Sequence, residues 1–104
     1  MKLFQNLTYS IVLLLLLHFS LTAQNQFKLS EDAYRANNRG VSLLEQFKSD
    51  EAEKQFRQAL TLKPDFKLAK INLAIALFNE KKLDEAKKII ADFLQIEPDR
   101  KSVV

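Results

Sequence analysis

The feature that most restricts the fold of this chain is an internal repeat with a period of 34 residues. The segment 38–65 returns at 72–99 with its small, large apolar and proline positions in the same order. A fixed period of this length is typical of helical hairpins that stack on one another. The aligned pairs include Asn38 and Asn72, Gly40 and Ala74, Leu43 and Leu77, Ala52 and Ala86, Phe56 and Ile90, and Pro64 and Pro98.

Hydrophobic periodicity within the repeat predicts four helices. Apolar residues recur every three or four positions in four segments, roughly 30–47, 49–62, 66–78 and 83–96. Ser30 is expected to begin the first helix, because a serine can cap a helix and two carboxylates follow it in the first turn. With Gly 1 and Pro 2 in 104 residues, the composition also favours helix over strands and turns.

Charge and cysteine content narrow the classes of function. The formal net charge is +3, but acidic and basic residues alternate along the expected helices, a pattern typical of solvated faces. We therefore expect no nucleic-acid partner. The chain has no cysteine, which excludes a disulfide framework, a thiolate metal site and a cysteine nucleophile.

The N-terminal segment 1–23 has the layout of a secretory signal peptide. Lys2 gives a short basic region, an apolar stretch follows, and Ala23 offers a small residue before Gln24 at which a signal peptidase would cut. An uncleaved membrane anchor is the alternative interpretation, because the apolar stretch lies at the short limit for crossing a bilayer. Residues 24–29 are expected to form a flexible linker.

The combined pattern resembles two consecutive tetratricopeptide repeats, at residues 30–65 and 66–98. Small residues in the pattern allow two helices to cross closely, and large apolar residues fill the space between hairpins. The resemblance implies a short right-handed α-solenoid. The matched positions are Gly40, Leu43, Ala52, Phe56, Ala59 and Pro64 in the first repeat, and Leu73, Ala74, Leu77, Ala86, Ile90 and Pro98 in the second.

Two departures from the pattern fall at the repeat interfaces. Ser49 stands where the second repeat has Leu83, and Phe93 replaces the small residue found at Ala59. These departures predict an unusual interface beyond the second repeat, where a repeat array usually continues or is capped. Self-association through this uncapped end is one expectation.

The resemblance implies binding to a protein or peptide, not catalysis. We find no catalytic constellation, metal-ligand cluster or cofactor motif in the sequence, and so predict none. In this family the first helix of each repeat lines a concave groove. Ordinary surface polarity remains an alternative for the asparagines, as does packing on a neighbouring repeat for the apolar pair. The expected groove residues are Tyr34, Asn37, Asn38, Val41, Asn72, Ile75, Phe78 and Asn79.

The sequence therefore predicts an exported interaction scaffold, periplasmic or extracellular, or membrane-anchored if residues 1–23 are retained. The alternative is the N-terminal repeat module of a larger secreted enzyme or receptor. Residues 99–104 match the translation of a common sequencing adapter in one frame. We expect them to be a non-native or disordered tail, with the natural protein continuing beyond Pro98.

Overall fold

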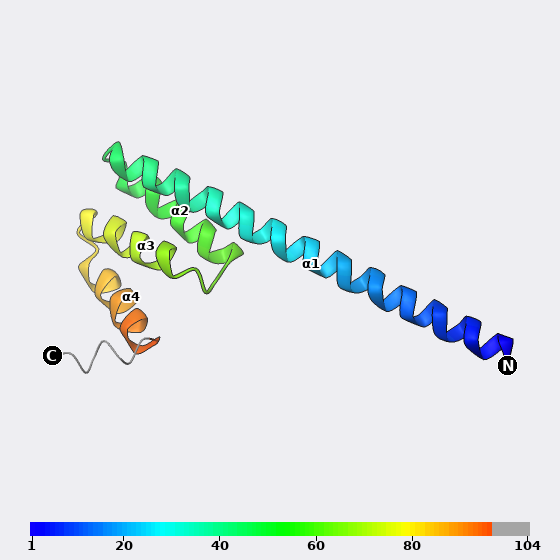
Figure 1. Ribbon diagram of the computed structural model, residues 1–104. Helices are drawn as coiled ribbons and strands as arrows, with labels where there is room; N and C mark the ends of the chain where they lie inside the picture. Colours follow the sequence, from blue (N-terminus) through cyan, green and yellow to red (C-terminus); the bar gives the residue numbers. More distant parts are fainter. Residues whose placement is uncertain (97–104) are drawn as a thin grey trace.

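The computed structural model describes residues 1–96, and every regular element in that range is an α-helix (Figure 1). The all-α prediction is therefore confirmed. The expectations for Pro98 and for the tail at 99–104 lie outside the described residues. The helices are α1 (Lys2–Glu45), α2 (Ser49–Leu62), α3 (Lys67–Asn79) and α4 (Leu83–Ile96).

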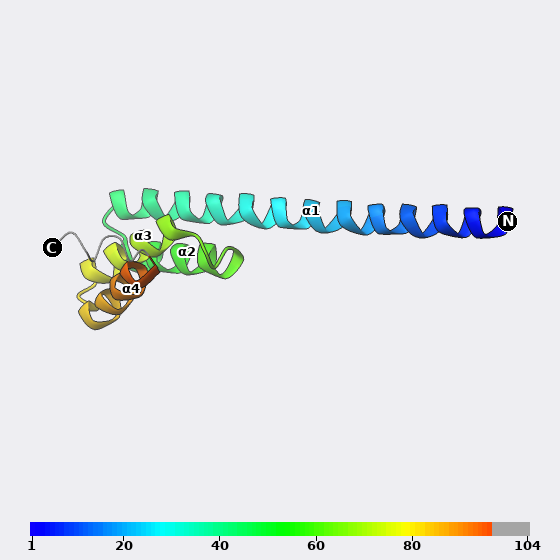
Figure 2. The ribbon, with the colours of Figure 1, turned by 60° about the horizontal axis from the view of Figure 1, so that its bottom comes forward.

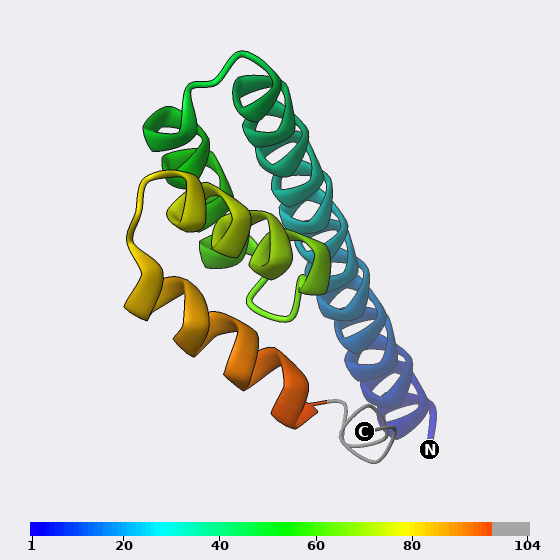
Figure 3. The same cartoon turned by 90° about the vertical axis from the view of Figure 1, so that its left-hand side faces the viewer.

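The four helices form two stacked hairpins. The C-terminal part of α1 packs along α2, and α3 with α4 forms the second hairpin (Figures 1 and 3). α3 is the helix of the second hairpin that contacts the first, and its contacts with α1, α2 and α4 make it the central element of the repeat pair. The arrangement is a short α-solenoid.

The two hairpin turns repeat each other in backbone conformation as well as in sequence. Phe47 and Lys81, which are 34 residues apart, both adopt positive φ, at 60° and 63°. The next residue in each turn donates a backbone hydrogen bond to the helix, from Lys48 N to Leu43 O (2.9 Å) and from Lys82 N to Leu77 O (2.8 Å). This left-handed ending satisfies the last carbonyls of each helix.

α1 differs from the expectation, because it does not begin at Ser30. The helix is continuous from Lys2, so the predicted linker at 24–29 is helical and Ser30 lies in the helix interior. No glycine or proline occurs before Gly40, and glutamine, leucine and lysine in the linker segment are good helix formers. Nothing local therefore ends the helix between the apolar segment and the first repeat.

The core lies between the hairpins and is built from small residues around a few large ones. Phe56 and Leu77 are the largest fully buried side chains, and Ala52 and Ala86 are buried beside them. A Cβ placed on Gly40 would come within 2.4 Å of the Phe56 ring. The expectation of a small residue at this helix crossing therefore has a direct steric reason.

The N-terminal part of α1 extends beyond the hairpins, which makes the molecule elongated at 71 × 36 × 18 Å (Figure 2). The side chains of residues 1–29 are all exposed. Among the described residues, α1 is the one helix long and apolar enough to cross a membrane by length and composition, and a signal sequence meets the same criterion. The second hairpin, by contrast, packs against the first through contacts of α3 with α2.

Candidate functional site

α3 is apolar on two opposite sides, and only one of them is covered. Its buried side packs against the first hairpin. The other side carries large apolar residues that are 40–65% exposed. A helix that is apolar all round is normally buried, so an exposed row of this kind is unusual. The buried residues are Ala69, Leu73, Ala76 and Leu77, and the exposed ones are Leu68, Ile71, Ile75 and Phe78.

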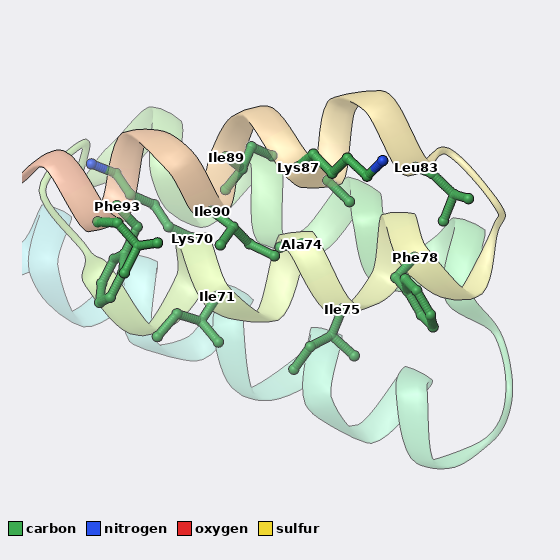
Figure 4. A pocket seen from close by; sticks show the side chains of 12 residues that line it. Lys70, Ile71, Ala74, Ile75, Phe78, Leu83, Lys87, Ile89, Ile90 and Phe93 are labelled. Atoms are coloured by element: carbon green, nitrogen blue, oxygen red, sulfur yellow. The ribbon is translucent and has the colours of Figure 1, made fainter. Parts of the chain in front are cut away.

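α4 completes this row into a groove with a volume of about 590 Å³, which we call the α3–α4 groove. Phe78 and Leu83 lie at the end next to the hairpin turn, and Lys70 and Phe93 lie at the other end (Figure 4). Among residues 1–96, Lys70 and Lys87 are the charged residues that line it, and no acidic residue in that range does. The groove is thus an apolar channel edged by positive charge.

The opposite side of the first hairpin is polar. A second hollow lies there, lined by Gln55 of α2 and by Arg35, Asn38, Arg39, Ser42, Leu43 and Gln46 of α1, all polar except Leu43. The Nε of Arg39 donates a 3.0 Å hydrogen bond to Oε1 of Gln55, which joins the two helices across this hollow. The two end faces of the repeat pair therefore differ in chemistry, since one is polar and internally bonded and the other is apolar and open.

The residues expected to line the concave groove differ in burial. Asn37 is buried, and its Oδ1 accepts a 2.9 Å hydrogen bond from Nδ2 of half-buried Asn72. This pair joins α1 to α3, and Asn72 keeps part of its side chain exposed. Val41 packs against the core.

The remaining expected groove residues are exposed on α1 and α3. Tyr34 and Asn79 are at the surface, with the Tyr34 ring in edge contact with Phe66 at 4.7 Å between centroids. Asn38 lines the polar hollow. Ile75 and Phe78 line the α3–α4 groove.

A cluster of charged side chains joins the second hairpin to α2 through hydrogen bonds and ion pairs. Oε2 of Glu53 accepts a 2.7 Å hydrogen bond from Lys82 Nζ, and Oε1 accepts one of the same length from Arg57 Nε. The bond from Lys82 is the largest cause that lowers the pKa of Glu53 from 4.5 to about 2. Burial and the neighbouring Glu53 raise the pKa of Glu80. Arg57 also bonds Glu85 of α4, so the cluster spans both hairpins.

Within residues 1–96, no group of three or more His, Cys, Asp or Glu side chains is placed to hold a metal ion. The charged cluster pairs carboxylates with lysine and arginine, which is a structural arrangement. The absence of catalytic, metal and cofactor sites stays a prediction from the sequence.

Stacked helical hairpins with an apolar groove at one end define the class of helical-repeat proteins that act through their surfaces. Residues 43–103 match the family model described as Tetratricopeptide repeat, and the chain belongs to this family. No curated protein and no solved structure matches the chain significantly. The resemblance inferred from the residues is thereby confirmed.

The α4 side of the groove was not among the expected site residues. Leu83, Ile90 and Phe93 come from the second helix of the repeat, and attention to the concave face alone overlooks them. The sequence did contain an indication, because Leu83 and Phe93 are two of the departures between the repeats. A helix-by-helix comparison of the two repeats therefore locates the groove.

Proposed function

We propose that this chain is an exported scaffold that binds a protein or peptide partner through the exposed surface of α1 and α3. The proposed contact residues are Tyr34 and Asn38 on α1, and Ile75, Phe78 and Asn79 on α3. Membership of the tetratricopeptide repeat family supports a protein–protein interaction role. Asn72 and Val41 support this surface from beneath, since both are half-buried.

The single observation on which this proposal depends is the exposed row on α3. Burying apolar surface yields about 25 cal/mol per Å², and a row of four large side chains on one rigid helix offers that energy to a partner. Aromatic residues such as Tyr34 and Phe78 are also enriched in protein interfaces. A purely solvated helix would carry polar residues at these positions.

Export is proposed from residues 1–23. Their apolar, fully exposed helix is compatible with either a cleaved signal peptide or a retained anchor. N-terminal sequencing of the protein purified from its host distinguishes the two. A mature chain that begins at Gln24 supports cleavage, and one that begins at Met1 supports the anchor.

Site-specific photo-crosslinking tests the binding surface. A benzophenone amino acid is placed at Tyr34 or Asn79 of the full chain, both outside the α3–α4 groove, and the protein is irradiated in its host. We expect the same partner protein to be crosslinked from both positions and identified by mass spectrometry.

Lys54 provides the matched control, because it is exposed on α2 away from this surface. The partner should be absent from crosslinks at Lys54. Equal crosslinking from all three positions, or none from Tyr34 and Asn79, would contradict the proposal.

A further inference from the structure

The internal repeat shows what the α3–α4 groove lacks. The corresponding surface of the first hairpin, 34 residues earlier, includes Val41, Leu44, Ala52 and Phe56. α3 covers that surface, so Phe56 is fully buried, whereas its counterpart Ile90 is 49% exposed. The second hairpin therefore presents an uncovered surface that corresponds to the one covered by α3 on the first hairpin.

The occupant of the first surface defines the shape of the ligand. α3 inserts Ala69, Leu73, Ala76 and Leu77, which recur at helical spacing along one face and are all buried. Alternating small and large residues let two helices approach closely. A helix with the same sequence of small and leucine positions would fit the α3–α4 groove.

One difference between the two surfaces concerns a polar contact. Asn37 on the first surface accepts a hydrogen bond from Asn72 of α3, but the counterpart of Asn37 is Ile71. An isoleucine cannot satisfy a buried amide, and an unpaired one is costly. The ligand helix must therefore be apolar where α3 has Asn72.

A second difference concerns charge. Glu53 on the first surface accepts a hydrogen bond from Lys82, in the turn after α3, but the counterpart of Glu53 is Lys87. The charge at this edge of the groove is thus reversed. The ligand helix must be followed by an acidic residue where α3 is followed by Lys82.

The same charges argue against a second copy of this chain as the occupant. In a two-fold dimer the same patch meets itself, which would bring together the lysines Lys70 and Lys87 of two copies, with no acidic side chain lining the groove in the described part of the chain. Head-to-tail stacking would place the polar hollow with Arg39 and Gln55 against the apolar groove. Neither arrangement is complementary.

We propose that the α3–α4 groove binds an amphipathic helix of a partner protein. This helix has the small–leucine pattern of α3, an apolar residue in place of Asn72 and an acidic residue in place of Lys82. The inference goes beyond the proposed function, because it adds the face of α4 and names the chemistry of the ligand; the two surfaces share Ile75 and Phe78. It does not depend on crosslinking at Tyr34 or Asn79.

Three synthetic peptides test this proposal on the full chain held in lipid nanodiscs. The first has the sequence of residues 66–82, the second adds Asn72→Leu, and the third adds both Asn72→Leu and Lys82→Glu. Fluorescence anisotropy measures their binding, with binding to empty nanodiscs subtracted. We expect Asn72→Leu to tighten binding at least fivefold, and Lys82→Glu to tighten it a further factor of about three at low salt.

Variants of the chain locate the binding. Lys87→Glu should reverse the preference, so that the peptide with lysine at the end binds more tightly than the one with glutamate. Lys88→Glu is the matched control, because Lys88 is exposed but does not line the groove, and it should leave the preference unchanged. Ile90→Asp should weaken binding at least tenfold. All three side chains are exposed, so the fold should tolerate these changes.

Four outcomes would overturn the proposal. These are no binding of the third peptide, equal binding of all three, an unchanged charge preference in Lys87→Glu, and unaltered binding in Ile90→Asp. Analytical ultracentrifugation of the nanodiscs adds a fifth. A dimer that Ile90→Asp dissociates would assign the groove to a second copy of this chain.

Discussion

At Gly40 the packing between α1 and α2 leaves no space for a side chain. The Phe56 ring fills the position that a Cβ would occupy, and that ring is fully buried. The second repeat solves the same crossing differently, with Ala74 opposite Ile90. A smaller residue on the first helix of a repeat is thus matched by a larger one on the second helix. Packed helices tolerate such paired substitutions when the total side-chain volume is conserved.

Gly40→Ala should destabilise the protein by about 2 kcal/mol, because overpacking against Phe56 outweighs the gain of about 1 kcal/mol in helix propensity. In a Phe56→Ile background, which copies the second repeat, the same change should be neutral or stabilising. Urea unfolding followed by circular dichroism measures both. An equal cost in the two backgrounds would show that the residues are not coupled.

At the scale of elements, polar side-chain contacts join the hairpins in addition to the apolar core. Asn37 and Asn72 link α1 to α3. Glu53 and Arg57 link α2 to the turn after α3 and to α4, through Lys82 and Glu85. Such contacts fix the register of one hairpin on the other, since neighbouring repeats stabilise each other mainly through their shared interface.

The Glu53 contact predicts a pH dependence. The pKa of the Glu53 carboxyl group is lowered to about 2. The ionised group therefore contributes to the free energy of unfolding above pH 4.5, and this contribution is lost as the pH falls from 4.5 towards 2. Glu53→Gln should cost about 1 kcal/mol at pH 7, because solvent screens the partly exposed partners. The variant should also lose less stability than the parent below pH 4.5 in thermal unfolding.

Glu80→Gln is the control for this titration. Because the pKa of Glu80 is raised in the folded state, its protonation stabilises the fold. As the pH falls, this protonation takes place before pH 4.5 is reached. The variant should therefore keep the loss of stability below pH 4.5. If Glu53→Gln and the parent lose stability in parallel down to pH 2, Glu53 is not the titrating group.

At the scale of the whole molecule, α1 joins two parts with different environments. Residues 1–29 are exposed along their whole length, whereas Ala33 and Ala36, one turn further on, are fully buried. One helix therefore forms the exposed apolar segment at its start and part of the repeat core at its end. The rigid connection fixes the direction in which the repeats project from that segment.

Removal of residues 1–29 should leave the repeat pair equally stable, because none of these residues is buried. Hydrogen exchange of α2 and α3 amides measures this, and protection should match that of the full chain. Removal through Asn37 is the matched control and should abolish protection, since it deletes two buried alanines and a buried asparagine. Lost protection in the shorter deletion would reveal a core contact from the N-terminal segment.

Much of the fold is encoded in local pattern. The 34-residue period, the apolar spacing and the small residues at crossings predicted the hairpins, their turns and the family, because helix formation depends on residues three and four apart. The start of α1 was predicted wrongly. A capping serine can begin a helix only where the preceding residues leave it, and the preceding segment is itself helix-forming.

The sequence by itself determined two helical hairpins, the close approach at Gly40 and the apolar N-terminal segment. Only the tertiary structure decided that Asn37 is buried against Asn72, that Glu53 pairs with Lys82, and that Ile90 and Phe78 stay exposed. The reason is physical. A helix pattern shows which faces are apolar, but burial of a face depends on what packs against it from a distant part of the chain.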